Sequence, residues 1–243
     1  MHKKNTTLFL AANAVIAALY AALTIALAPI SYGPLQFRVS EALTALPFLM
    51  PGSVLGITVG CVIANIYTGS VLDIVFGSLA TLLAGLATAW FGKKGSTVKN
   101  RVLGCFMPVI FNAVIVGAVL TWGYQLQEFA SPLKSYGFNA LTVGVGEAGV
   151  LYLIGYTLLR QLPKIKSVRE FIVRFNGQAA KESHAFEYII SLLVPFVGFI
   201  YGAIILSKED ENRRAVGKRC IILGLISAAL SALFIPLQIC YFK

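Results

Sequence analysis

Residues 8–28 form an apolar run without a single charged side chain, LFLAANAVIAALYAALTIALA. As an α-helix at 1.5 Å per residue, a run of this length spans about 30 Å, which is the thickness of the hydrocarbon layer of a membrane. Similar apolar runs recur along the chain and are separated by short links that contain charges, glycine or proline. The sequence therefore predicts an all-α, polytopic integral membrane protein, since helices satisfy their own backbone hydrogen bonds in lipid.

The first run also has features of a secretory signal peptide, because Lys3 and Lys4 precede it and it ends in Ala26-Leu27-Ala28. Its apolar part is longer than the roughly 7 to 15 residues of a signal-peptide core, and Pro29 follows directly after the possible cleavage site. We therefore expect the run to be retained as the first membrane span.

The composition of the whole chain indicates the same class. Of its 243 residues, 58% are hydrophobic and 12% are charged, and the mean hydropathy is +0.80. One water-soluble core of this length cannot bury that much apolar surface. The formal net charge is +10, but the Lys and Arg residues flank the ends of apolar runs, which is typical of membrane topology. These features exclude a soluble enzyme and a nucleic-acid-binding domain.

Further spans are expected at about residues 38–51, 52–68, 71–91, 102–122 and 140–160. With the first span they form a six-helix membrane domain over residues 1–162, with both ends on one side. The positive-inside rule places the amino terminus in the cytoplasm, because most basic links then lie inside. Only Arg38 and Lys134 remain in the outer links.

The carboxy-terminal part has a different character. Residues 163–185 carry Lys164, Lys166, Arg169 and Arg174 around an apolar helical stripe of Val168, Phe171, Ile172 and Phe175. This pattern predicts a basic amphipathic linker on the cytoplasmic membrane surface. Residues 186–243 are expected to add two more helices, at about 187–206 and 220–241, whose topology and role the sequence leaves open.

Polar side chains inside the spans are the informative residues for function. A charge at the centre of a bilayer costs roughly 3 kcal/mol or more, so each is expected to face a partner or a watery cavity. Under the orientation above, these residues converge on the outer half of the bundle and predict a pocket that opens outward. They are Arg38, Glu41, Asn65, Asp73, Asn112 and Glu147.

Most of these residues also have a structural interpretation. Arg38 and Glu41 stand three residues apart and can neutralise each other, and Asp73 can favour the positive end of its helix. Asn112 follows Pro108 and can belong to the packing of a kink. Glu147 lies between Gly146 and Ala148 with no cation nearby in sequence, which favours a ligand that offers paired N–H donors or a cation.

Aromatic and small residues complete the set of candidates. Tyr32 and Phe37 can cover a planar ligand, or they can belong to an interfacial aromatic belt. Small residues repeat every fourth position at Ala14, Ala18, Ala22 and Ala26, and again at Gly52, Gly56, Gly60 and Ala64. Such stripes let another helix approach closely, either within the bundle or from a partner protein. The four cysteines lie in apolar runs without metal-ligand spacing, and we expect no metal or cofactor.

Four segments resemble one family in the same order. They are SYGPLQFRVSEALTALP at 31–47, GCVIAN at 60–65, DIVFGSLAT at 73–81 and GVGE at 144–147. Residues 8–162 thereby resemble the QueT family, the substrate-binding (S) components of energy-coupling-factor (ECF) transporters for queuosine precursors. The resemblance does not extend to the carboxy-terminal part.

The resemblance implies a six-helix S component in a bacterial cell membrane. It would bind 7-aminomethyl-7-deazaguanine or its 7-cyano relative from outside, with residues 31–37 as a lid. It would dock through Ala14, Ala18, Ala22 and Ala26 on an ECF transmembrane coupling subunit that is driven by two ATPase subunits. A guanine-like edge presents two adjacent N–H donors that suit Glu147, while Asp73 or Glu41 would balance the aminomethyl ammonium.

Other functions remain open at this stage. One is an S component or solitary transporter for another vitamin-like heterocycle, and another is a purely structural or regulatory membrane protein. A membrane-embedded enzyme that uses Glu147 and Asp73 as acid and base is less favoured, because no nucleophile or metal set accompanies them. We therefore expect no enzymatic activity.

Overall fold

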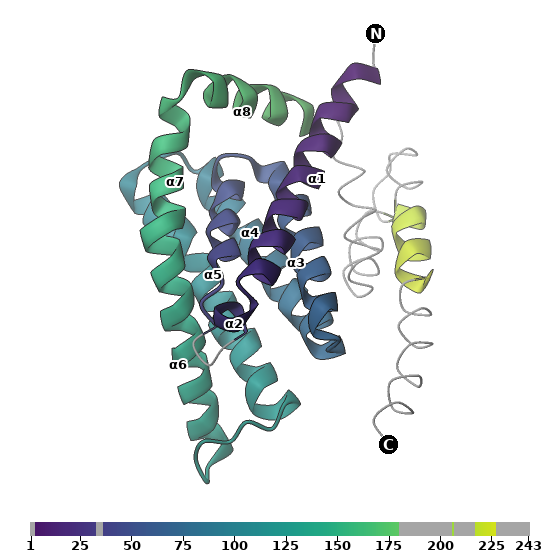
Figure 1. Ribbon diagram of the computed structural model, residues 1–243. Helices are drawn as coiled ribbons and strands as arrows, with labels where there is room; N and C mark the ends of the chain where they lie inside the picture. Colours follow the sequence, from purple (N-terminus) through teal and green to yellow (C-terminus); the bar gives the residue numbers. More distant parts are fainter. Residues whose placement is uncertain (1–2, 33–35, 180–205, 207–216, 227–243) are drawn as a thin grey trace. The chain divides into compact units, whose positions relative to one another are not determined.

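The computed structural model describes residues 3–32, 36–179, 206 and 217–226 (Figure 1). The chain divides into two compact units, Met1–Ala180 and Lys181–Lys243. Of the second unit, Leu206 and the helical residues 217–226 are described. The two spans expected at 187–206 and 220–241 otherwise lie outside the described residues.

The first unit is built from helical segments that follow one another with short links. In chain order they are α1 (Lys3–Ala26), α2 (Ala28–Ser31), the 3₁₀-helices η1 (Val39–Phe48) and η2 (Pro51–Ser53), α3 (Val54–Thr68), the π-helix η3 (Asp73–Gly77), α4 (Ser78–Lys93), α5 (Val98–Ala118), the π-helix η4 (Val119–Gly123), α6 (Pro132–Val150), the π-helix η5 (Leu151–Gly155), α7 (Tyr156–Gln161), the 3₁₀-helix η6 (Leu162–Lys164) and α8 (Lys166–Ala179). The described part of the chain contains no strand, and the predicted all-α membrane class is confirmed.

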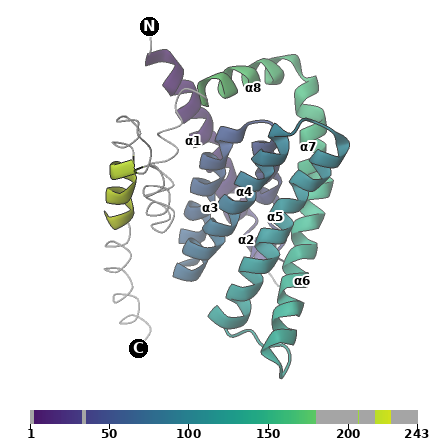
Figure 2. The same ribbon diagram turned by 180° about the vertical axis from the view of Figure 1, so that it is seen from behind.

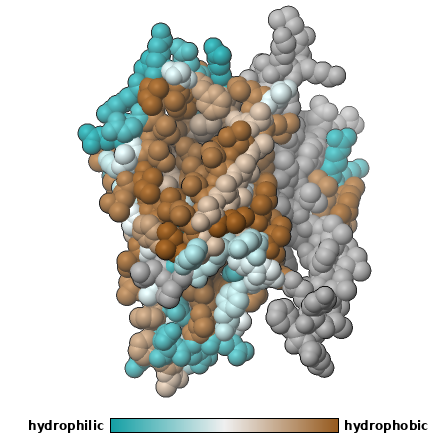
Figure 3. All heavy atoms as spheres, viewed as in Figure 1, coloured by the Kyte–Doolittle hydropathy of each residue, from teal (hydrophilic) through white to brown (hydrophobic). Residues whose placement is uncertain are grey.

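Five of these segments are long and apolar enough to cross a membrane. They are Thr7–Ala26, Pro51–Thr68, Asp73–Lys93, Val98–Gly123 and Pro132–Lys164. Each overlaps one of the spans expected from the sequence. Figure 3 shows the corresponding hydrophobic band across one face of the molecule, between hydrophilic regions at its two ends. Long, predominantly apolar runs therefore located the spans, because in lipid they have few alternatives to a helix.

The expected span at 38–51 differs from the other five. It forms the ten-residue 3₁₀-helix η1, with Pro47 inside it. At about 2.0 Å per residue such a helix covers roughly 20 Å, which is short of a hydrocarbon layer. Most of its residues, including Glu41, Ala45 and Phe48, are buried. η1 is therefore an internal rod of the bundle, and its polar start is placed in the interior.

The last span is longer than expected. It begins at Pro132 instead of about residue 140, and it continues for 33 residues through the π-helix η5. Proline at the first position of a helix is favourable, because its missing N–H has no partner there. Glu147 therefore lies 15 residues into the span, or about 22 Å from its start along the helix axis.

The two small-residue stripes have different surroundings. The glycine stripe of α3 packs on α1, since a Cβ atom at Gly60 would lie 2.7 Å from the carbonyl oxygen of Ala17. The backbone N–H of Gly56 donates to Oδ1 of Asn13 at 2.8 Å. The alanine stripe lies on the other side of α1 and is exposed at all four positions, Ala14, Ala18, Ala22 and Ala26. Close packing within the bundle thus accounts for the glycines and leaves the alanines outside it.

Helix α8 crosses one end of the bundle beside the first turns of α1, as both ribbon views show (Figures 1 and 2). The predicted apolar stripe of this helix faces the bundle: the ring of Phe175 is fully buried and stacks on Phe9 with a centroid distance of 5.1 Å. Nδ2 of Asn176 donates to the carbonyl oxygen of Leu49 at 2.9 Å. Lys166, Arg169 and Arg174 remain exposed. We call this end of the first unit the α8 end and the opposite end the α2 end.

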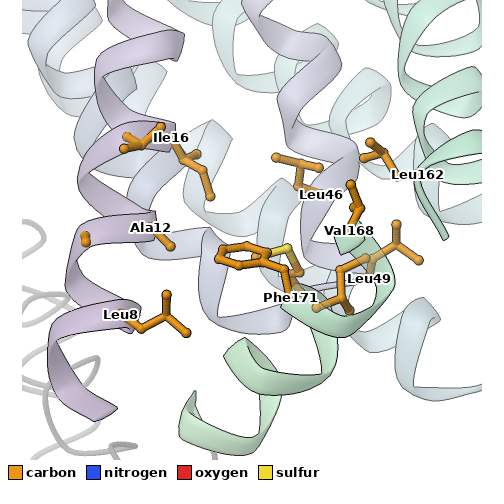
Figure 4. A pocket seen from close by; sticks show the side chains of 12 residues that line it. Leu8, Ala12, Ile16, Leu46, Leu49, Leu162, Val168 and Phe171 are labelled. Carbon is orange, nitrogen blue, oxygen red and sulfur yellow. The ribbon is translucent and has the colours of Figure 1, made fainter. Parts of the chain in front are cut away.

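An apolar cavity of about 460 Å³ lies under α8, between α1 and η1 (Figure 4). Its lining includes Leu8, Ala12 and Ile16 of α1, Leu46 of η1, and Phe171 of α8. The lining side chains carry no hydrogen-bonding groups, so this cavity does not suit a polar heterocycle. The polar side chains predicted to bind a ligand gather elsewhere.

Candidate ligand-binding site

Arg38 precedes η1 and is almost completely buried, with 7% of its surface exposed. Its Nε donates to the carbonyl oxygen of Ser31 at 3.3 Å, and its Nη1 lies 3.5 Å from Oδ1 of Asn65. The guanidinium also lies over the ring of Tyr32, 5.1 Å from the centroid. These contacts hold Arg38 between the start of η1, the link after α2, and α3.

Glu41 is also buried, but it is not hydrogen-bonded to Arg38. Its Oε1 accepts a hydrogen bond from the hydroxyl of Tyr20, and its Oε2 is buried without a partner. The interpretation of Arg38 and Glu41 as a simple self-neutralising pair therefore does not account for the contacts of either side chain. A buried acceptor that lacks a hydrogen bond costs about 1–3 kcal/mol, and more when it is charged. The unpaired Oε2 of Glu41 therefore calls for an explanation, such as a bound molecule that donates a hydrogen bond to it.

Sequence reasoning missed Tyr20, which is fully buried on α1. One signal was present: a tyrosine in the middle of an uncharged span must find a partner for its hydroxyl when it is buried. The identity of that partner was not readable, because Glu41 is 21 positions away on another helix.

Glu147 lies on α6 with 4% of its surface exposed. Its Oε1 accepts a hydrogen bond of 2.8 Å from Nδ2 of Asn112 on α5, while its Oε2 is buried without a partner. Asn112 also neighbours Glu41, and the two carboxylates interact electrostatically with each other and with Arg38. The structure thus brings Glu41, Asn112 and Glu147 together from three different helices, and we call them, with Arg38 and Tyr20, the buried polar cluster.

Asn65 of α3 supports this cluster from the α2 end. Its Nδ2 donates to the carbonyl oxygen of Asp73 at 2.8 Å and contacts Sγ of Cys61 at 3.4 Å. Glycine at position 77 permits this contact, because a Cβ atom there would lie 2.9 Å from the same nitrogen. Asn65 therefore joins α3 to the π-helix η3 and turns its oxygen toward Arg38.

Asp73 is half-buried, at the first residue of η3, and its carboxylate already has protein partners. Its Oδ2 accepts hydrogen bonds from the hydroxyl of Tyr124 at 2.7 Å and from Oγ1 of Thr68 at 3.5 Å. Tyr124 follows η4, so this contact joins two helix ends at the α2 end. Asp73 therefore differs from the two buried glutamates, each of which has an oxygen without a partner.

Tyr32 and Phe37 are half-buried on either side of residues 33–35, which lie outside the described part of the chain. The hydroxyl of Tyr32 donates to the carbonyl oxygen of Ala64 on α3 at 2.8 Å. The ring of Phe37 lies against α6, since a Cβ atom at Gly149 would be 3.1 Å from Cε2 of Phe37. The two aromatic residues therefore contact two different helices, α3 and α6.

The chemistry available in the cluster is hydrogen-bond acceptance by buried carboxylates. Oε2 of Glu41 and Oε2 of Glu147 can each accept N–H donors from a bound molecule. Among the described residues, no group of three or more His, Cys, Asp or Glu side chains is placed to hold a metal ion. The arrangement is suited to recognising a small molecule with several N–H groups.

Comparison with known proteins agrees with the family resemblance. The QueT transporter family matches residues 10–164, a region that includes every member of the buried polar cluster. The queuosine precursor transporter QueT of Lactococcus lactis subsp. cremoris (strain MG1363) is 41% identical over 83 residues, which cover 33% of this chain and 49% of that relative. The chain thus matches about half the length of this relative, and no solved structure matches. Because the family match covers more than half of the chain, the protein belongs to the QueT transporter family.

Proposed function

We propose that the chain is the membrane subunit that captures a queuosine precursor, 7-aminomethyl- or 7-cyano-7-deazaguanine, outside the cell. It then delivers this precursor inward together with an ECF coupling subunit and two ATPase subunits. Membership of the QueT family and the name of the Lactococcus relative support the substrate class. The structural observation that carries the proposal is Oε2 of Glu147, a buried carboxylate oxygen without a partner inside a membrane bundle.

Glu147 suits a guanine-like edge for a geometric reason. Such an edge presents a ring N–H beside an exocyclic amine, and a carboxylate can accept both hydrogen bonds in parallel. The hydrogen bond from Asn112 to Oε1 fixes the carboxylate and leaves a lone pair on that oxygen, while Oε2 is open. An adenine-like edge would aim a ring acceptor at the same oxygens, which is repulsive. Glu147 is therefore the proposed discriminator between the two kinds of ring.

Tyr32 and Phe37 are the proposed aromatic walls of the site. Arg38 stacks on Tyr32, and Phe37 packs against α6 two residues beyond Glu147, at Gly149. Both rings thus belong to the link beside the buried polar cluster, where a flat heterocycle gains from stacking.

The distribution of charge supports the proposed direction of uptake. The exposed basic residues of α8 lie at the α8 end, and positive charge favours the cytoplasmic side. The amino terminus would then be cytoplasmic, and the α2 end, near which Arg38 contacts Asn65 and Tyr32, would face outward. The exposed alanine stripe of α1 is the proposed docking face for the coupling subunit, because small side chains permit close approach of another helix.

Uptake in cells tests this proposal. Cells that express the chain together with an ECF coupling subunit and its two ATPases should accumulate labelled 7-aminomethyl- or 7-cyano-7-deazaguanine. Cells that lack either the chain or the ATPases should not. Accumulation that persists without the ATPases would contradict the proposed mechanism, and failure to accumulate either compound would contradict the proposed substrate.

A further inference from the structure

The buried polar cluster contains two carboxyl groups, those of Glu41 and Glu147, and one guanidinium, that of Arg38. Glu147 interacts electrostatically with Glu41 and Arg38, and Glu41 also interacts electrostatically with Arg38. The other members of the cluster, Tyr20 and Asn112, are neutral. When both carboxyl groups are ionised, the described surroundings are one positive charge short of balance, and in a dry interior that charge is costly until a cation or a proton neutralises it.

The hydrogen bonds within the protein leave one oxygen of each glutamate available to a ligand. Arg38 is directed toward Ser31, Asn65 and the ring of Tyr32, and it donates no hydrogen bond to either glutamate. Glu41 is 1% exposed and Glu147 is 4% exposed, and each has an Oε2 atom without a partner. Both Oε2 atoms are therefore buried acceptors without a hydrogen bond, and a molecule that enters the cluster can donate hydrogen bonds to them.

We propose that Glu41 makes this site select a cationic deazapurine over a neutral one of the same ring. A ligand that carries a protonated primary amine balances the second carboxylate, whereas a neutral ligand leaves it uncompensated unless a proton is bound as well. Primary amines such as that of lysine are protonated at neutral pH. The inference rests on the proposed function, and it favours the 7-aminomethyl compound over the 7-cyano compound.

Glu41 is assigned this role instead of Asp73 because of their surroundings. The carboxylate of Asp73 accepts hydrogen bonds from Tyr124 and Thr68 and is half-buried, so solvent and protein already stabilise its charge. Glu41 is fully enclosed, and Tyr20 satisfies only one of its two oxygens. The side chain that gains most from an incoming cation is therefore Glu41.

The test is the ratio of two dissociation constants. The 7-aminomethyl and 7-cyano compounds share the ring that Glu147 would recognise, so the ratio isolates the effect of the substituent. Isothermal titration calorimetry on the purified full-length protein should give at least about 10-fold tighter binding of the amine, the effect of one charge-assisted hydrogen bond. Glu41→Gln should raise the dissociation constant of the 7-aminomethyl compound by a similar factor. The dissociation constant of the 7-cyano compound should change by no more than about threefold. This variant keeps an oxygen that can accept the Tyr20 hydrogen bond.

Three outcomes would overturn the inference. The first is that the unaltered protein binds both compounds equally, or binds the 7-cyano compound more tightly. This comparison does not require the Glu41→Gln variant to fold. The second is equal weakening of both compounds by Glu41→Gln, which would indicate a purely structural role. The third is loss of the preference in Asp73→Asn but not in Glu41→Gln. If neither compound binds the unaltered protein, the proposed function itself is wrong. This result differs from the three above, in which the proposed function stands and only the role of Glu41 is wrong.

Discussion

Nδ2 of Asn112 lies 2.8 Å from Oε1 of Glu147, and this hydrogen bond joins α5 to α6 inside the bundle. The amide satisfies one carboxylate oxygen and leaves the other without a partner. A purely structural carboxylate at this depth would be expected to have both oxygens paired, because each unmet acceptor is costly. The half-satisfied state of Glu147 is consistent with a ligand that supplies the remaining donors.

The first prediction concerns Glu147 itself. Glu147→Gln removes the charge but keeps an oxygen that can accept the hydrogen bond from Asn112, so the fold should be preserved. Binding of either 7-deazaguanine should weaken by about 10- to 150-fold, the equivalent of 1.5–3 kcal/mol for a charge-assisted hydrogen bond. Calorimetry on purified protein measures this change. Glu128→Gln, at an exposed position in the link before α6, is the matched control, and equal affinities in the two variants would remove Glu147 from the site.

The second prediction separates docking from ligand binding. Replacing both Ala18 and Ala22 with leucine enlarges an exposed face of α1 that makes no contribution to the buried polar cluster. We expect uptake and co-purification with the coupling subunit to be lost, while the affinity for the ligand stays within about threefold, because bulky side chains prevent close helix approach. Val114→Phe enlarges an exposed position on α5 as a control. Loss of ligand binding in the double leucine variant would instead show that the alanine stripe supports the fold.

The third prediction concerns the packing of α1 on α3. Gly60→Ala places a methyl group 2.7 Å from the Ala17 carbonyl oxygen, so α1 must move away. Overpacking of this kind costs about 1–3 kcal/mol, and the melting temperature in detergent should fall. Gly137→Ala on α6 is the control, since a Cβ atom there meets nothing within 4 Å. Equal melting temperatures for both variants would show that the two helices do not pack as closely as described.

The fourth prediction concerns Tyr20. Tyr20→Phe removes the hydroxyl that donates to Oε1 of Glu41, so this buried oxygen loses its hydrogen bond while Oε2 already lacks one. The free energy of unfolding should drop by about 1–3 kcal/mol, the cost of a buried unpaired acceptor. Thermal unfolding in detergent tests this, with Tyr67→Phe at an exposed position of α3 as the control. A melting temperature unchanged from that of the control would indicate that the hydrogen bond contributes nothing to stability.

Much of the architecture was predictable because it depends on local composition. Long, predominantly apolar runs located the helices from Thr7 to Ala26 and from Val98 to Gly123 within a few residues. The exception was 38–51, where Pro47 and the polar start accompany a short 3₁₀-helix. Its local pattern resembles that of a short membrane helix, and only its burial by neighbouring helices distinguishes the two.

The site was predictable as a set of residues but not as a set of contacts. Arg38, Glu41, Asn112 and Glu147 were singled out because polar groups in lipid need partners. Which partner each one has depends on how separate helices pack, and one chain gives no signal for the pairing of Asn112 with Glu147 across 35 positions. For the same reason the contact of Asp73 with Tyr124, and the part played by Tyr20, emerged only from the structure.

The central claim is that Glu147 holds a deazaguanine, and native mass spectrometry of the purified protein tests it most directly. Protein incubated with equal amounts of 7-aminomethyl-7-deazaguanine and 7-deazaadenine should carry one molecule of the former per chain, and Glu147→Gln should show a clearly lower occupancy under the same conditions. Binding of 7-deazaadenine in preference to the deazaguanine, or equal occupancy in the unaltered and Glu147→Gln proteins, would contradict the claim.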